Sequence, residues 1–470
     1  MPPISLLYDG FGIFDDVFNE SAPVPGESDI LEIRLWDMVG KFAEGMSAFY
    51  PSDAARRGAL HGHLEEIFGA RRNTLAGGGI LASKIGSRQI ITDGHLNGAH
   101  GAIVFCVECK NELSGITSEP SVELVSYVAS SFKEGLQKHP ALFEGWRAPA
   151  LGMIQIGGWT QHTLRLHPLT QHSGSYVQFY GIVMIVQMRA VPLTPMLPLQ
   201  TSTNDELSRR RIFLAFKAAS IVVAKIQADV LQHIQKPPLA IHHTFRQFPS
   251  VTEISSTADP LSQPEPIRFT LLKRYDEITS RNLYHAVTST GGEIFVKFTQ
   301  RYSRELHAFC TQKRLAPELL GFERLPGGWF ALAMEKVLTV DVSKIGSRLR
   351  SDGWKKDIGN LVHEFHKKGL VHGDLRPPNF IFTAATPHRM LLVDFDWGGK
   401  ERQVFFPPGD LAPGLRDEYD HLDLPITKQD DNRVLSATFR WLDERTEGDV
   451  GAKANTDVGT EMDVDPVGHA

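Results

Sequence analysis

The sequence predicts a two-domain protein of mixed α+β and α/β class, with a proline-rich linker between the domains. First, helical spacing of apolar residues alternates with short strand-like runs along most of the chain. Second, the chain has 470 residues, about three times the length of a typical domain. Third, residues 204–235 form an amphipathic stretch without Gly or Pro. Pro237 and Pro238 end this stretch, and a segment rich in Pro, Ser and Thr follows them. We therefore expect a linker at 237–266.

Shifts in composition divide the chain further. The first residues carry several Pro and Gly without a sustained period, and the last residues are rich in Gly, Asp and Glu with little to bury. Helical spacing recurs over 29–48, 53–71 and 121–138, and strand-like runs occupy 88–94 and 102–110. The predicted segments are a flexible N-terminus over 1–28, a domain over 29–200, a connecting helix over 201–236, the linker over 237–266, a second domain over 267–445 and a disordered acidic tail over 446–470.

Composition narrows the class of protein. Hydrophobic residues make up 42% and charged residues 22%, as in ordinary soluble proteins. The net charge of −6 argues against bulk attraction to nucleic acid, and no apolar run approaches the ~20 residues of a membrane-spanning helix. There are three cysteines and no secretory signal pattern. We therefore expect an intracellular protein of the cytoplasm or nucleus without a membrane partner.

The stretch LVHGDLRPPNFIF, residues 370–382, carries the clearest chemical signal. Phosphoryl transfer needs a few charged groups that position a nucleotide, its metal ions and an acceptor hydroxyl. Asp374 would steer the proton of the hydroxyl, Arg376 would neutralise the transferring phosphate, and Asn379 would hold a metal ion. In the following run LLVDFD, Asp394 comes after three apolar residues, where it could chelate Mg²⁺.

Residues further upstream complete this set. Lys297 lies in the strand-like run EIFVKF, from which its ammonium could reach the phosphates of a nucleotide. Glu305 follows eight residues later in a predicted helix and could orient Lys297 through a salt bridge. Met334, Glu335 and Val337 belong to the run MEKV, a predicted hinge whose backbone would meet an adenine.

Lys297, Glu305, the HGDLRPPN loop and the strand of Asp394 occur in the order that resembles the protein-kinase-like superfamily. The resemblance covers roughly 267–445. It implies a bilobal domain, ATP and Mg²⁺ as cofactors, and a hydroxyl acceptor. About 50 residues follow Asp394 before the tail begins, so a shortened C-lobe is expected.

Several motifs depart from the superfamily pattern. No Gly-x-Gly-x-x-Gly lies between 267 and 296, and no Ala-Pro-Glu follows the Asp394 strand. Residues 372–374 read His-Gly-Asp in place of His-Arg-Asp, and residues 394–396 read Asp-Phe-Asp in place of Asp-Phe-Gly. The His-Gly-Asp form is similar to small-molecule and atypical kinases. Regulation by activation-loop phosphorylation is therefore not expected, whereas the catalytic set is retained.

A second candidate site lies in the N-terminal domain. Glu108 and Lys110 are two residues apart in AIVFCVECK, so a strand would place both side chains on one face. Asp93 ends the preceding predicted strand, and Glu65 in a predicted helix could add a carboxylate. Carboxylates that bind Mg²⁺ next to a lysine are suited to phosphodiester cleavage. The same residues could instead form a solvated strand edge.

The Asp and Glu-x-Lys pattern resembles the restriction-endonuclease-like, PD-(D/E)xK, α/β fold. Together with VECKNELSG, EPSVELVSYV and the HGDLRPPN loop, it resembles a group of fungal proteins that fuse such a domain to a kinase-like domain and are related to Crinkler effectors. Members often show a Gln on the helix after the strand, where this chain has Glu123. The resemblance implies DNA as a possible partner.

Three functional hypotheses follow. The first is an ATP- and Mg²⁺-dependent phosphotransferase that acts on Ser or Thr hydroxyls of a protein substrate. The second is a DNA-cleaving effector whose kinase-like domain only binds nucleotide or partners. The third is a two-domain scaffold without catalysis. The sequence does not indicate the oligomeric state or whether the two domains are coupled.

Overall fold

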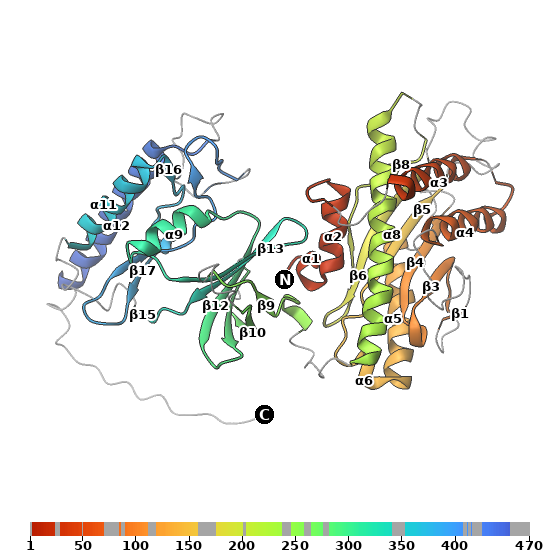
Figure 1. Cartoon of the computed structure of the whole chain (residues 1–470), viewed down its shortest axis with the longest axis horizontal. Helices are drawn as coiled ribbons and strands as arrows, with labels where there is room; N and C mark the ends of the chain where they lie inside the picture. Colours follow the sequence, from red (N-terminus) through yellow and green to blue (C-terminus); the bar gives the residue numbers. More distant parts are fainter. Residues whose placement is uncertain are drawn as a thin grey trace. The chain divides into compact units, whose positions relative to one another are not determined.

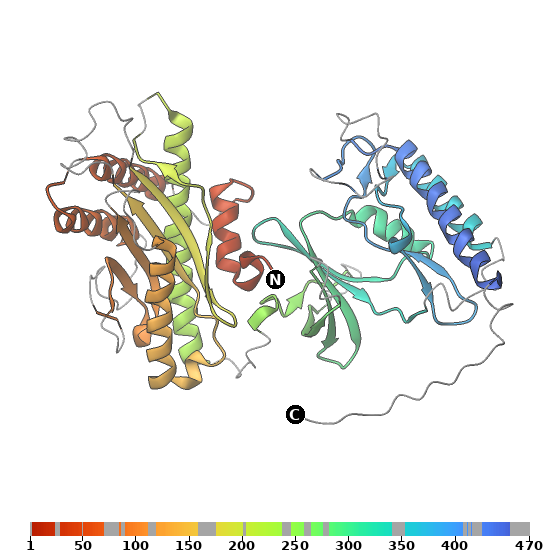
Figure 2. The same cartoon turned by 180° about the vertical axis from the view of Figure 1, so that it is seen from behind.

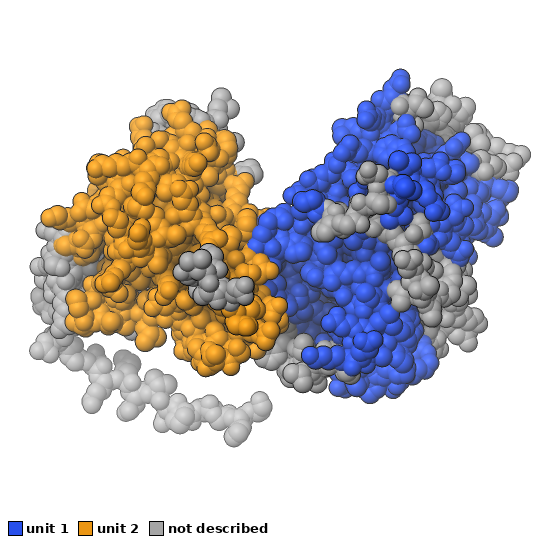
Figure 3. Space-filling view, viewed as in Figure 1, with its two compact units in different colours: residues 1–251, 324–328 blue, residues 252–323, 329–470 orange. Residues whose placement is uncertain are grey.

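Two units make up the chain in the computed structural model (Figures 1 and 3). Unit 1 comprises residues 1–251 and 324–328, and unit 2 comprises residues 252–323 and 329–470. The residues that the structure describes are 2–23, 29–48, 50–69, 84–85, 90–110, 119–157, 175–200, 204–236, 246–257, 265–275, 282–340, 353–407, 411, 415 and 425–451.

A mixed sheet forms the centre of unit 1. Its strands lie in the order β3-β4-β5-β6-β7, with β4 and β5 parallel and the other neighbours antiparallel. Both faces of β4 and β5 are largely buried, which explains their almost continuous apolar sequences. The strands of unit 1 are β3 (Gly94–Asn97), β4 (Ile103–Lys110), β5 (Ala150–Ile156), β6 (Tyr176–Met184), β7 (Met188–Pro192), β8 (Leu197–Pro198), which pairs with β6, and a separate pair, β1 (Lys84–Ile85) and β2 (Ile90–Ile91).

Helices cover both faces of this sheet (Figures 1 and 2). Helix α8 packs on one face, where the rings of Phe216 and Phe179 lie 5.2 Å apart. Helix α5 packs on the other, where Leu124 lies against Gly152 of β5. The helices are α1 (Ile4–Leu7), α2 (Asp9–Phe18), α3 (Asp29–Ser47), α4 (Asp53–Gly69), α5 (Pro120–Lys138), α6 (Pro140–Phe143) and α8 (Glu206–Gln235), with a short 3₁₀ turn, η1 (Ala99–Gly101).

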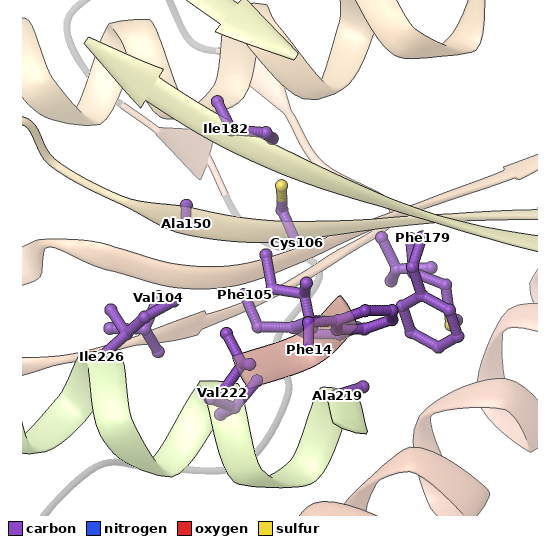
Figure 4. Close-up of a cluster of buried hydrophobic side chains, with 14 of the residues drawn as sticks. Phe14, Val104, Phe105, Cys106, Ala150, Phe179, Ile182, Ala219, Val222 and Ile226 are labelled. Carbon is purple, nitrogen blue, oxygen red and sulfur yellow. The ribbon is translucent and has the colours of Figure 1, made fainter. Parts of the chain in front are cut away.

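The core of unit 1 lies between the sheet and α8 (Figure 4). Phe105 and Phe179 from the strands meet Val222 and Ile226 of α8, and Phe14 of α2 packs beside them. All five side chains are buried. The predicted connecting helix over 201–236 is thus a central core element of unit 1. Its apolar stripe becomes buried by packing against this face of the sheet.

The N-terminus differs from the prediction of a flexible segment over 1–28. Residues 4–18 form α1 and α2, and Phe11, Phe14 and Val17 are buried in the core of unit 1. Gly10 and Gly12, which favoured flexibility in the sequence, lie inside α2. Burial of three large apolar side chains offsets the helix-breaking tendency of glycine.

Unit 2 begins with an antiparallel sheet followed by a short helix. The strands lie in the order β13-β14-β12-β11-β10-β9, and Lys297 is on β12, the third long strand of the sheet in sequence. The strands are β9 (Glu253–Ile254), β10 (Ile267–Arg274), β11 (Asn282–Thr288), β12 (Glu293–Thr299), β13 (Leu319–Leu325) and β14 (Trp329–Glu335), and the helix is α9 (Arg304–Gln312).

A second, more helical part completes unit 2. Its core joins Phe365, Leu375, Phe395 and Val434 with apolar residues of α9. Its elements are β15 (Thr339–Val340), α11 (Gly353–Lys367), β16 (Leu370–Val371), η5 (Pro377–Asn379), β17 (Phe380–Thr383), β18 (Met390–Leu392), β19 (Gly399–Lys400) and α12 (Lys428–Gly451); β15, β17 and β18 form one small sheet, and β16 and β19 another.

Two predicted boundaries differ from the structure. Part of the predicted linker, Glu253–Ile254, forms strand β9 and pairs with Ile267 and Arg268 of β10, so unit 2 starts before residue 267. Helix α12 continues to Gly451, past the predicted end at 445, and the rest of the predicted tail lies outside the described residues. Within the described ranges, no helix combines the length and the apolar character that crossing a membrane requires.

Candidate functional site

A cavity of about 180 Å³ in unit 2 collects most of the residues predicted to bind a nucleotide. Apolar side chains, including Leu283, Phe295 and Ile381, form much of its wall, which suits a planar base. The lining residues are Tyr275, Leu283, Phe295, Lys297, Tyr302, Pro317, Met334, Glu335, Val337, Thr339, Pro378, Ile381, Val393 and Asp394. The predicted hinge and the predicted lysine thus face one cavity. Residues 276–281, within the stretch that lacks the Gly-rich motif, lie outside the described residues.

Lys297 is held by two carboxylates. Its Nζ lies 2.5 Å from Oδ1 of Asp394 and 2.6 Å from Oδ1 of Asp396. Burial alone would lower the pKa of Lys297, but the charges of Asp396 and Asp394 raise it above its ordinary value. Burial raises the pKa of Asp396 to about 6, against the opposing effect of Lys297. The lysine therefore stays charged and faces the cavity from a fixed position.

The predicted Lys297–Glu305 salt bridge is absent from the described part of the chain. Helix α9 begins at Arg304 after the N-cap Ser303, so Glu305 falls in the first turn and is exposed. The side chains of α9 that turn inward are Leu306, His307, Phe309 and Cys310. A gap of eight residues therefore places Glu305 on the outer face of the helix, and Asp394 and Asp396 pair with the lysine instead.

The His-Gly-Asp loop is anchored by a buried carboxylate from α12. Asp431, with an exposed fraction of 0%, accepts hydrogen bonds from the amides of His372 and Gly373, both at 2.8 Å. His366 Nε2 lies 3.0 Å from the same carboxylate. Gly373 has φ +82°, and a Cβ there would lie 2.8 Å from a side-chain carbon of Ile426, so both conformation and space favour glycine. The loop is therefore fixed by residues about 60 positions away.

Asp374 and Arg376 form a bidentate pair in this loop. Arg376 Nε lies 2.5 Å from Oδ1 of Asp374, and its Nη2 lies 2.9 Å from Oδ2. The hydrogen bonds to Asp374 raise the pKa of Arg376. Asp374 is buried except for 6% of its surface. The pair orients a carboxylate and supplies a neighbouring positive charge, as proton steering beside a phosphate requires.

Asn379 supplies an unpaired oxygen in the same region. Its Nδ2 donates to the carbonyl of Asp374 at 2.8 Å, and its backbone carbonyl accepts from the amide of Val393 at 2.9 Å. These bonds fix its side chain, whereas its buried Oδ1 has no hydrogen-bond partner among the described residues. A buried amide oxygen without a donor is costly unless a ligand satisfies it.

Asn379 Oδ1 and Asp394 fit the donor set that Mg²⁺ prefers, since this ion binds oxygen and takes one or two carboxylates together with phosphate oxygens. Over the described ranges, no group of three His, Cys, Asp or Glu side chains is arranged to hold a metal ion. An ion in unit 2 would therefore depend on Asp394, on Asn379 and on oxygens of the nucleotide.

The second candidate site, in unit 1, brings together a lysine and two carboxylates. Lys110 Nζ lies 2.7 Å from Glu108 Oε1 and 2.8 Å from Glu123 Oε2 of α5. Tyr127 donates to Glu108 Oε2 at 2.5 Å. Burial raises the pKa of Glu108 to about 8, with a further contribution from Glu123. Glu123 therefore belongs to this cluster, in the place where the resemblance expected a Gln.

Asp93 and Glu65 are arranged differently from the prediction. Asp93 accepts from the amide of Cys109 at 2.9 Å and pairs with Arg57 at 3.1 Å. Glu65 is exposed on α4 and is not gathered with Asp93 and Glu108 into a metal-binding group in the described residues. The cause is local. One carboxylate oxygen of Asp93 accepts from the amide of Cys109 on β4, and the other pairs with Arg57.

Sequence reasoning did not assign two residues that the structure places in the site of unit 2. Asp396 appeared only as a departure from the Asp-Phe-Gly motif, and no local pattern in the sequence indicated its contact with Lys297. Asp431 carried no recognisable signal, because an acidic residue at the start of a helix is common and its loop contacts are long-range.

The C-terminal unit is kinase-like. The sequence model of the lipopolysaccharide kinase (Kdo/WaaP) family matches residues 333–437, which run from β14 into α12 and contain the HGDLRPPN loop and Asp394. The match spans about a fifth of the chain, so it supports the kinase-like superfamily for this unit and leaves unit 1 unassigned. A comparison with the curated proteins found no match.

Solved kinase structures are also similar to the chain at low scores. The Cydia pomonella granulovirus kinase PK-1 is 16% identical, with a TM-score of 0.30, over 37% of this chain and 68% of that one. A Toxoplasma gondii rhoptry antigen kinase domain is 13% identical, with a TM-score of 0.27, over 41% and 69%. The Rad53 kinase domain with SCD2, in complex with AMPPNP, is 22% identical, with a TM-score of 0.21, over 28% and 51%. We base the assignment on the family match and the site geometry.

Proposed function

We propose that unit 2 transfers the γ-phosphate of ATP to a hydroxyl group with the help of Mg²⁺. One observation carries this proposal: the unpaired, buried Oδ1 of Asn379 lies in the loop beside Asp374, next to the strand that leads to Asp394 and the Lys297 cavity. In a loop with a purely structural role, most buried polar atoms are hydrogen-bonded within the protein. A metal–nucleotide site leaves it free for its ligand.

Each residue has a role that follows from its contacts. Asp374, held by Arg376, accepts or steers the proton of the attacking hydroxyl, and Arg376 offsets charge on the transferring phosphate. Asn379 and Asp394 would hold Mg²⁺, which when bound neutralises charge on the phosphates. Lys297 contacts the phosphates, and the backbone at 334–337 receives the adenine.

The acceptor class is proposed as Ser or Thr hydroxyls of a protein, in line with the resemblance to protein kinases. The name of the matching family points to lipopolysaccharide as an acceptor of its members, so a sugar hydroxyl is the alternative. Both acceptors require the same proton steering by Asp374. The assay therefore includes a generic protein acceptor and a panel of saccharides.

The test is transfer of labelled phosphate from ATP by the full chain in the presence of Mg²⁺. Asp374→Asn is expected to lower the rate about 100-fold or more, because it removes the group that steers the proton. Asp357→Asn, an exposed aspartate on α11, is the matched control and should leave the rate unchanged. If the wild-type chain transfers no phosphate to protein, saccharide or itself, the proposal is wrong.

A second candidate function is metal-assisted cleavage of DNA by unit 1, through a restriction-endonuclease-like fold. The observation that favours it is the convergence of Glu108, Lys110 and Glu123 at distances of 2.7 and 2.8 Å, with Asp93 close enough to raise the pKa of Glu108. A metal ion would favour the ionised form of Glu108 and could release Lys110 to assist an attacking water.

This second function is tested by nicking of plasmid DNA with Mg²⁺ or Mn²⁺. Lys110→Ala should abolish nicking, whereas Lys133→Ala, an exposed lysine on α5, should not. Nicking without phosphate transfer would favour the DNA-cleaving effector. If both assays are blank with folded protein, the scaffold hypothesis remains.

A further inference from the structure

The segment 394–396 presents two carboxylates to one lysine. Phe395 is buried and stacks on His307 of α9, with ring centroids 4.5 Å apart and planes 13° from parallel. Its carbonyl accepts from the amide of Ser303 at 3.0 Å. Asp394 has φ +69°, outside the extended region, so regular strand alternation does not apply to this segment. Asp394 and Asp396, on either side of Phe395, nevertheless both reach Lys297.

The two carboxylates are not equivalent. Both oxygens of Asp396 are engaged, since Oδ1 lies 2.6 Å from Lys297 Nζ and Oδ2 lies 3.1 Å from Thr299 Oγ1 on the same strand as the lysine. Asp394 is the residue assigned above to Mg²⁺. A metal ion bound there would draw charge away from the contact between Asp394 and Lys297.

The usual partner of this lysine in kinases is a glutamate on the helix that follows the strand. Here the first-turn Glu305 is exposed on α9, and the ion pairs of Lys297 within the described chain are with Asp394 and Asp396. A charged lysine that is 8% exposed needs a lasting anionic partner. Once Asp394 serves the metal, Asp396 is the remaining one.

We propose that Asp396 is the positioning residue for Lys297, in the role that a helix glutamate has in other kinases, and that Thr299 orients Asp396 for it. This inference rests on the proposed phosphotransfer function. It explains why an aspartate stands where the superfamily has the glycine of Asp-Phe-Gly: with the helix glutamate turned outward, the counter-charge comes from the metal-binding segment itself.

The first measurement is the steady-state dependence of phosphate transfer on ATP. Asp396→Asn keeps the size of the side chain and removes its charge, so KM for ATP should rise about tenfold while kcat stays within about threefold. Glu305→Gln tests whether Glu305 positions Lys297 instead. If Glu305→Gln raises KM and Asp396→Asn does not, the inference is overturned.

The second measurement does not depend on activity. Labelling of Lys297 by an amine-acylating reagent is followed against time at one fixed pH by mass spectrometry of its peptide, in the full chain without nucleotide. Asp396→Asn removes one of the two carboxylate contacts that hold Nζ in place, so Lys297 should label several-fold faster than in the wild type. Asp357→Asn should follow the wild-type curve. An unchanged curve for Asp396→Asn overturns the inference.

The two measurements separate failure of the inference from failure of the proposed function. A wild-type chain without phosphate transfer refutes the function, and the labelling curve still reports on Asp396. A transferring wild type with an unaltered Asp396→Asn refutes the inference alone. If Asp396→Asn loses its cooperative melting transition, Thr299→Val replaces it, with an expected rise of about threefold in KM for ATP. An unchanged KM then contradicts the proposal.

Discussion

Both units hold a lysine between two carboxylates, and the two clusters differ in charge. In unit 1, Lys110 lies within 2.8 Å of Glu108 and Glu123; in unit 2, Lys297 lies within 2.6 Å of Asp394 and Asp396. Burial raises the pKa of Glu108 to about 8 but that of Asp396 only to about 6. Glu108 therefore holds its proton to a higher pH than Asp396 does.

This difference in pKa means that the two clusters, although built from similar side chains, suit different ligands. The two aspartates beside Lys297, together with the unpaired Oδ1 of Asn379, provide oxygens for a divalent cation. In unit 1, Tyr127 donates to Glu108 and the proton on Glu108 reduces its charge. A metal ion there would first have to displace that proton.

Asp394→Asn should lower the rate of phosphate transfer about 1,000-fold, because it removes the proposed carboxylate ligand of Mg²⁺ from the reacting phosphates. Initial rates with labelled ATP measure the loss. Glu108→Gln, the counterpart change in unit 1, should leave this rate unchanged. Equal losses of rate in both variants would show that the two clusters do not differ in their role in phosphate transfer.

Asp431→Asn should lower the free energy of unfolding of unit 2 by about 3 kcal/mol, because the buried carboxylate binds two loop amides and His366. Thermal melting combined with hydrogen exchange of the 370–376 peptide measures the change. Peptides of β4 and β5 in unit 1 serve as the internal control. Unaltered protection of the loop would show that Asp431 does not anchor it.

Glu108→Gln should make the stability of unit 1 less dependent on pH. The pKa of Glu108 is raised from 4.5 to about 8, so between these values the folded state binds a proton that the unfolded state releases. Stability therefore falls as pH rises through this window in the wild type, whereas a glutamine at this position has no proton to release. Urea unfolding at pH 5, 7 and 9 measures the slope. Identical slopes in variant and wild type would refute the assignment.

Arg376→Lys should have the smallest effect, lowering kcat about fivefold. A lysine keeps the charge but cannot form the bidentate contact with Asp374. Steady-state kinetics at saturating ATP give the value. Arg376→Lys changes how the Asp374 carboxylate is oriented, whereas Asp374→Asn removes that carboxylate. If Arg376→Lys lowered kcat as much as Asp374→Asn, Arg376 would have a chemical role of its own.

The sequence predicted the parts of the site that are close together along the chain. The HGDLRPPN loop and the run LLVDFD carried enough local pattern to indicate Asp374, Asn379 and Asp394, and Lys297 followed from strand alternation. Glu305 was wrong as the partner of Lys297, because the exact start of a helix decides which way a first-turn side chain points.

Long-range packing accounts for the other differences. Asp431 reaches His372 from about 60 residues away, and no local pattern records that contact. The helices over 4–18 escaped prediction because Phe11, Phe14 and Val17 need the sheet of unit 1 and helix α8 to bury them. Propensity alone favoured a flexible segment, and tertiary packing overrode it.

The most direct test of the central claim is calorimetric titration of ATP into the full chain with and without Mg²⁺, in the wild type and in Asn379→Ala. The account predicts that Mg²⁺ strengthens ATP binding to the wild type at least tenfold and that Asn379→Ala loses most of this gain, because Oδ1 is then absent. Binding of ATP with the same affinity in all four titrations, or no binding at all, would contradict it.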